Sequence, residues 1–262
     1  MGCCARRRQK NYKLYDRSLL VLRAMDIRRL FVRSLTFIYF IAFASSFSQW
    51  PGLHSDSGIL PTSNQGKWTT SDDFMFSLHV LGMVISLALT FEIFLTSNLM
   101  FLLPMIYSVI IKTSRVTGAP FFNYQWDLLL IETGVIGCLW GVKTTGLRDQ
   151  PPRSVAWALR FLAFKLMFSS GVVKILHGDP TWLNLKALNF HFASQPLPNP
   201  IAWLAHQSPD SLLRIGTAGS MWIEIPVALL ILSPFEIPRS FAAFTTTLLM
   251  INILSNKQFF TK

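Results

Sequence analysis

One apolar tract, residues 74–111, is nearly twice as long as the roughly 20 residues that a helix needs to cross a bilayer. A polar run from Thr96 to Asn98 lies in its middle, so the tract is predicted to form two spans joined by a tight hairpin. The second of these spans is short and contains Pro104. In lipid, only helices and closed barrels satisfy every backbone polar group. A chain with this tract is therefore predicted to fold as membrane helices.

Composition extends this prediction to the whole chain. Of its 262 residues, 51% are apolar and only 14% are charged, a balance typical of a polytopic membrane protein. The sequence thus predicts an all-α transmembrane helix bundle of about five to seven spans, in which a strong span is about 20 residues long. The other expected spans are 30–49, 124–140, 154–175, 211–232 and 240–254.

The net charge of +11 is concentrated near the start of the chain, where 10 of the 24 basic residues occupy the first 33 positions. Basic residues before a first span are typical of a cytosolic N-terminus. A nucleic-acid partner is disfavoured because no aromatic residues interleave with a basic stripe on a folded domain. The predicted organisation is a basic cytosolic segment (1–29), a bundle (30–255) with a long lumenal loop (177–211), and the start of a C-terminal region (256–262).

Metal and cofactor sites are not predicted. The three cysteines give no disulfide framework, because two lie in the basic segment and one lies in an apolar span. His177, His191 and His206 are separated by 14 and 15 positions, which matches no usual zinc-ligand spacing.

The long loop begins at a break, Gly178-Asp179-Pro180. Asp179 is suited to cap a helix and Pro180 to occupy its first position. In the helix predicted to follow, one face carries the apolar side chains, and a second set lies away from it. The apolar face comprises Trp182, Leu185, Leu188 and Phe192, and the other set comprises Asn184, Lys186 and His191.

Beyond this helix, Pro196 and Pro198 predict an extended strap, because proline-rich segments favour the polyproline conformation. Residues 201–206 are predicted to turn back to the membrane as a short helix, with Trp203 as anchor. Two roles stay open for the loop: a rigid cap on the bundle, or a partner-binding surface. In the second role, the binding candidates are Trp182, Asn184, Lys186, His191 and Trp203.

Charges inside spans need partners or water, because an unpaired charge in lipid is costly. Folding the spans 124–140 and 154–175 about their loop brings Glu132 to the depth of Lys165, which predicts an intramembrane ion pair. Lys174 is expected near the boundary, where water solvates it. Glu224 is interpreted as a single polar group. A structural role for these charges is favoured over an ion path, which would need charges or broken helices in several spans.

Two stretches resemble the lipase maturation factor family. The first is FNYQWDLLLIE, from Phe122 to Glu132. The second runs from Arg160 to Gln207 and contains the elements SGVVK, GDPTW, FHF, QPLP and AHQ in order. The resemblance covers about residues 120–255.

The resemblance implies a multi-pass protein of the endoplasmic reticulum membrane that helps dimeric secreted lipases, such as lipoprotein lipase, to fold and assemble. It implies no catalytic activity, no cofactor, and lipases and membrane lipid as partners. Family members continue into a large lumenal domain that would begin near Lys262, so an inactive fragment is one alternative. The other is a membrane enzyme with the helix layout of the vitamin K-dependent carboxylase, for which the candidates are Asp179, His191 and Lys174.

Overall fold

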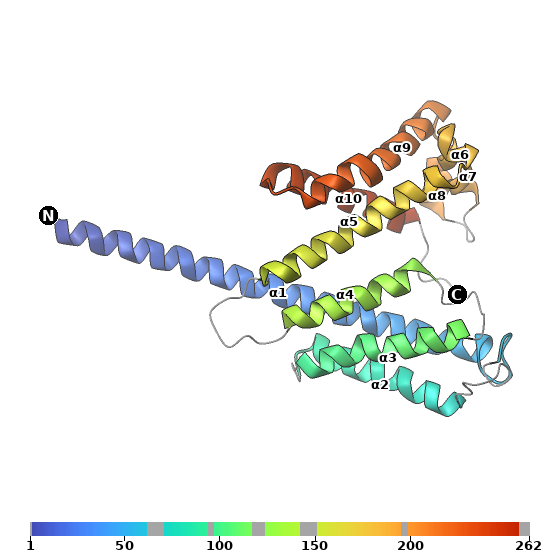
Figure 1. Ribbon diagram of the computed structural model, residues 1–262, viewed down its shortest axis with the longest axis horizontal. Coiled ribbons are helices and arrows are strands. Elements are labelled where there is room, and N and C mark those ends of the chain that lie inside the picture. Colours follow the sequence, from blue (N-terminus) through green and yellow to red (C-terminus); the bar gives the residue numbers. More distant parts are fainter. Residues whose placement is uncertain are drawn as a thin grey trace. The chain divides into compact units, whose positions relative to one another are not determined.

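The computed structural model describes residues 2–61, 71–93, 97–116, 124–141, 151–194 and 199–256 (Figure 1). Regular structure in these ranges is helical, with no strand. This confirms the predicted all-α class. The larger helices are α1 (Gly2–Leu53), α2 (Asp72–Thr90), α3 (Ser97–Val116), α4 (Gln125–Gly141), α5 (Arg153–Leu176), α9 (Asp210–Trp222) and α10 (Glu236–Asn256).

Short elements complete the chain between α5 and α10. A π-helical turn, η2 (Ile223–Val227), and a 3-10 turn, η3 (Leu230–Leu232), continue directly from α9. Three short helices lie between α5 and α9: α6 (Pro180–Leu183), α7 (Ala187–Ala193) and α8 (Pro200–His206).

A helix is found at each of the predicted spans. Within the described ranges, four segments are both long and apolar enough to cross a membrane, which makes the chain a multi-pass membrane protein. The region around Pro104 forms a shorter apolar helix, Leu99–Thr113, as its sequence indicated. The four long segments are Arg28–Leu53, Asp72–Thr90, Asp210–Leu232 and Glu236–Ser255.

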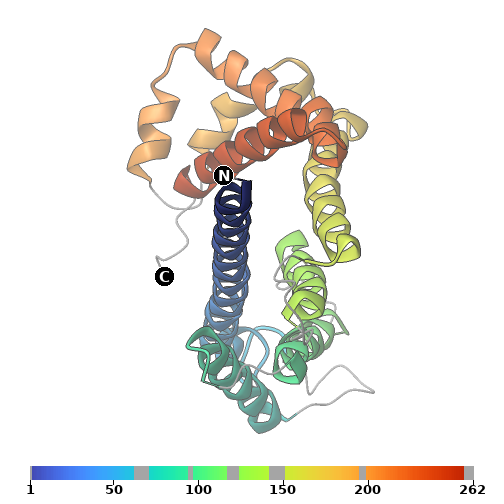
Figure 2. The same ribbon diagram turned by 90° about the vertical axis from the view of Figure 1, so that its left-hand side faces the viewer.

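The chain divides into two compact units, Met1–Ala156 and Trp157–Lys262. In the first unit, α2 packs along the C-terminal half of α1, and α3 lies between α2 and α4 (Figures 1 and 2). Aromatic side chains fill the core of this unit: Tyr39, Phe43 and Trp50 are almost fully buried.

Polar contacts fix the register of the helices in the first unit. Tyr39 donates from its hydroxyl to the Leu130 carbonyl at 2.8 Å, and Gly134 leaves room for that hydroxyl. His79 of α2 is fully buried and its Nε2 lies 2.8 Å from the Ser46 hydroxyl of α1. This buried histidine therefore has a hydrogen-bond partner in the neighbouring helix.

In the second unit, α5, η2, η3 and α10 share one apolar core. Met167 of α5 packs among Val227, Ala228, Ile231 and Ala242, all of which are buried. The three short helices α6, α7 and α8 lie together where α5 ends and α9 begins (Figure 1). This end of the unit contains the segment that the sequence singles out.

Candidate functional site

The break after α5 follows the local sequence. Gly178 adopts the left-handed region, with φ of +62°, and ends the helix. Asp179 then caps α6, because its Oδ1 accepts hydrogen bonds from the Thr181 amide at 2.9 Å and the Thr181 hydroxyl at 2.8 Å. Pro180 occupies the first helical position. The predicted roles of Gly178, Asp179 and Pro180 are confirmed.

The prediction of a single helix after Pro180 is wrong, because the segment forms two helices, α6 and α7. The chain leaves α6 in a Schellman motif, in which Lys186 donates its amide to the Thr181 carbonyl (2.8 Å) and Leu185 donates to Trp182 (3.1 Å). Leu185 takes the left-handed position with φ of +58°, where glycine is usual. A left-handed non-glycine residue costs about 1–2 kcal/mol. Neighbouring contacts must hold this strained turn in place.

An ion pair joins Lys174 of α5 to Glu224 of η2 beside α6. The side chains are only 17% and 4% exposed, respectively. The Ser170 hydroxyl donates a further hydrogen bond to Glu224 at 3.3 Å. The ring of Trp182 lies over the ammonium group, with Nζ 4.3 Å from its centre. Glu224 is therefore not a single polar group, and Lys174 is held by a carboxylate and a ring rather than solvated by water. The sequence analysis was wrong on both points.

Backbone features bring these groups together. Pro226 lacks an amide hydrogen and lies inside the π-helical turn that carries Glu224. Such turns are rare and frequently mark functional sites. Gly171 allows α5 to approach this turn closely, because a Cβ there would lie 2.5 Å from Ile225 Cγ1. We call Ser170, Lys174, Trp182 and Glu224 the clamp.

Contacts with the start and middle of α9 hold α7 in place. Asn189 donates from its amide nitrogen to Asp210 Oδ1 at 2.7 Å. The Leu188 amide donates to the Thr217 hydroxyl at 3.4 Å. The Leu188 side chain packs over Gly216, where a Cβ would be only 2.8 Å from Leu188 Cδ1. Part of the predicted apolar face therefore packs on the bundle.

The binding candidates of the sequence separate into two groups. Trp182 belongs to the clamp and His191 is partly buried against Phe192, with ring centres 5.6 Å apart. Asn184, Lys186 and Trp203 are exposed within their unit. Other apolar side chains of the segment are also exposed and were missed by the sequence analysis. They are Leu183, Phe190, Ile201 and Leu204.

Two predictions for this region are not tested by the structure. Pro196 and Pro198 lie outside the described residues. Glu132 belongs to the first unit and Lys165 to the second, so their ion pair stays a prediction.

Two of the side chains considered for catalysis, Lys174 and Asp179, make structural contacts. Lys174 is engaged by a carboxylate and by an aromatic ring. The hydrogen bonds from Thr181 lower the pKa of Asp179, so this carboxylate stays ionised and has no proton to donate near neutral pH. No group of three or more His, Cys, Asp or Glu side chains suited to a metal ion occurs in the described part of the chain.

Comparisons with known proteins give a consistent assignment. The lipase maturation factor transmembrane domain matches residues 26–261. Lipase maturation factor 2 of Xenopus tropicalis is 33% identical over 266 residues, which cover 89% of this chain and 37% of the relative. The Homo sapiens protein of the same name is 31% identical over 270 residues, which cover 89% of this chain and 38% of the relative.

A second group of relatives is named lipase maturation factor 1. The Mus musculus protein is 29% identical over 230 residues, covering 76% of this chain and 39% of the relative. The chain thus spans less than two fifths of the length of these relatives. No solved structure matches it. Because the domain match extends over nearly the whole chain and its membrane helices, the chain belongs to the lipase maturation factor family.

Proposed function

We propose that this protein is a non-catalytic factor of the endoplasmic reticulum membrane that assists the folding and assembly of secreted lipases. Its N-terminus lies in the cytosol, and the segment from Gly178 to Gln207 lies on the lumenal side and contacts the client. Membership of the lipase maturation factor family supports lipases as the clients. The basic residues before the first span support the orientation.

The observation that carries the client role is the preorganised form of the described parts of this segment, residues 178–194 and 199–207. Capped short helices, the clamp, and the contact between Asn189 and Asp210 hold it on the membrane helices. Leu183, Asn184, Lys186 and Phe190 nevertheless stay exposed. A segment that is already ordered loses little conformational entropy when a partner docks, so more of the contact energy becomes affinity.

The orientation can be tested by glycosylation, because the sequence contains no Asn-x-Ser/Thr acceptor. Lys186→Thr turns Asn184 into an acceptor within the segment. We expect this variant to gain a glycan that an endoglycosidase removes. The matched variant, Arg148→Asn with Gln150→Thr, places an acceptor in the predicted cytosolic loop and should stay unmodified. If only the second variant were glycosylated, the predicted orientation would be wrong.

The client role predicts a loss of lipase capture. Phe190→Ser and Lys186→Ala remove an exposed apolar and an exposed basic side chain, and Asn184→Ala and His191→Ala extend the series. Since Phe190 and Lys186 are exposed, these two changes should leave the protein level intact. We expect Phe190→Ser to reduce co-precipitation of a co-expressed lipase by about tenfold, as losing one anchor of 1–2 kcal/mol would.

Asp56→Ala supplies the control for this series. Asp56 is exposed in the loop after α1, on the side predicted to be lumenal, and lies outside the segment. Capture should be unchanged in this variant. If capture also persists in Phe190→Ser and Lys186→Ala at equal protein level, the client does not bind this segment.

A further inference from the structure

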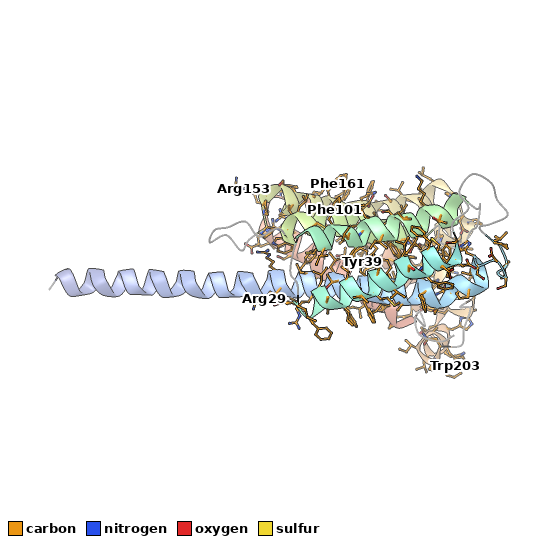
Figure 3. The ribbon with its side chains drawn as sticks, turned by 90° about the horizontal axis from the view of Figure 1, so that it is seen from below. Arg29, Tyr39, Phe101, Arg153, Phe161 and Trp203 are labelled. Atoms are coloured by element: carbon orange, nitrogen blue, oxygen red, sulfur yellow. The ribbon has the colours of Figure 1, made fainter. Side chains whose placement is uncertain are left out.

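The outer face of α8 is apolar and uncovered within its unit. At about 100° per residue, Trp203, Leu204 and Ile201 occupy one half of the helix circumference, opposite Ala202. Their exposed fractions are 63%, 62% and 51%, whereas Ala202 is 2% exposed and faces inward. Figure 3 shows Trp203 at the outer edge of the second unit.

This face lies next to the end of a membrane span. The Asn199 side chain caps α8, accepting from the Ile201 amide at 2.9 Å, and also donates to the Ser255 carbonyl in the last turn of α10 at 3.1 Å. The α10 helix exposes an apolar stripe at helical spacing, formed by Phe244, Leu248 and Ile251. This helix is long and apolar enough to cross a membrane, so its exposed stripe is suited to contact lipid.

The α8 face is thus tied to the end of a helix that is suited to lipid. It is attached at the end of α10, where the apolar core of the bilayer gives way to the headgroups. Tryptophan is enriched at this depth, because its ring is apolar and its indole N–H can reach water. His206 and Gln207, which follow the apolar face, are polar and exposed. An apolar half-cylinder beside a polar end is typical of a helix that lies in the membrane interface.

A soluble client fits this face less well. A client bound there would have to enter the boundary between headgroups and acyl chains, because α8 is tied to the end of a helix suited to lipid. The face also presents no acidic or basic side chain: Ile201, Ala202, Trp203, Leu204 and Ala205 are all apolar.

We propose that α8 is an interfacial anchor, which inserts Ile201, Trp203 and Leu204 among the lipids at the leaflet surface where α10 ends. The anchor holds the segment from Gly178 to Gln207 against the membrane, so the segment cannot swing away as a free lid. Trp203 then contacts lipid rather than a client. This proposal does not depend on the client role.

Site-directed spin labelling tests the anchor. Cys3→Ser, Cys4→Ser and Cys138→Ala remove the native cysteines of the sequence. Trp203→Cys or Leu204→Cys then carries a nitroxide in phosphatidylcholine vesicles. We expect oxygen, which concentrates in lipid, to collide with these labels several-fold more often than a water-soluble nickel complex does. Phe244→Cys supplies the lipid reference and Asn184→Cys the aqueous reference.

Each outcome decides between occupants of the face. Labels at positions 203 and 204 that behave like the one at 244 support the anchor. Labels that behave like the one at 184 show a face in water, open to a client, and overturn it. Labels shielded from both reagents show a face covered by protein, such as a second copy of the chain, and overturn it too. Two positions are labelled so that the result does not depend on one variant. A poorly folded variant is recognised because it elutes early in size-exclusion chromatography, and it is set aside.

Discussion

Lys174→Met is expected to lower the free energy of unfolding by roughly 3–5 kcal/mol, the usual effect of removing one partner from a buried ion pair. Glu224 would stay in an environment where its side chain is only 4% exposed, without the ammonium group that compensates its charge. The remaining hydrogen bond from Ser170, at 3.3 Å, cannot replace that charge. Trp182 would also lose the cation beneath its ring.

The second half of this prediction is a rescue. Adding Glu224→Gln to Lys174→Met removes the uncompensated charge and keeps an acceptor for Ser170, so much of the lost stability should return. The measurement is the fraction of detergent-solubilised protein that still elutes as a single species after heating. Lys186→Met is the matched control, because Lys186 is exposed and outside the clamp. Additive losses in the double variant would show that the pair does not act as a unit.

These variants also bear on the membrane-enzyme alternative. Loss of function in Lys174→Ala alone would not indicate catalysis, because the same change breaks the clamp. Function that returns in the rescued double variant, which lacks the lysine, would exclude a catalytic role for Lys174.

Sequence reasoning succeeded where the determinants are local. Gly178, Asp179 and Pro180 each have a strong residue-type preference for the place they occupy, so the end of α5 and the start of α6 could be predicted from neighbouring positions. Four of the predicted spans are helices long and apolar enough to cross a membrane. They could be predicted because the bilayer sets the length of apolar sequence that a spanning helix needs.

Sequence reasoning failed where the determinants are distant or atypical. Leu185 follows α6 in a conformation that leucine rarely adopts, so its residue type did not predict the break between α6 and α7. The partners Lys174 and Glu224 are 50 positions apart, and only non-consecutive elements bring them together. One signal was present in the sequence: Glu224 lies two residues before Pro226 within an apolar span, where a charge and a helix breaker together indicate a site.

Because α5 approaches η2 closely at Gly171, we expect alanine substitutions at two glycines to change stability in opposite directions. Gly171→Ala is expected to destabilise the protein by about 1–3 kcal/mol, the usual cost of overpacking. The added Cβ would lie 2.5 Å from Ile225 Cγ1 and 3.0 Å from Glu224 Cβ. Both atoms are close to the backbone of η2, so α5 and the turn must separate. Separation would also weaken the ion pair of the clamp.

Gly219 of α9 is the matched control, because a Cβ there has no neighbour within 4 Å. Gly219→Ala should leave stability unchanged or raise it by up to about 1 kcal/mol, since alanine favours the helix more than glycine does. Thermal elution profiles of the two variants should therefore shift in opposite directions. Gly171→Val, with a larger side chain at the same contact, should lose more than Gly171→Ala. Equal, small effects at both glycines would mean that α5 does not depend on the close contact with η2, and the clamp would then rest on its charges alone.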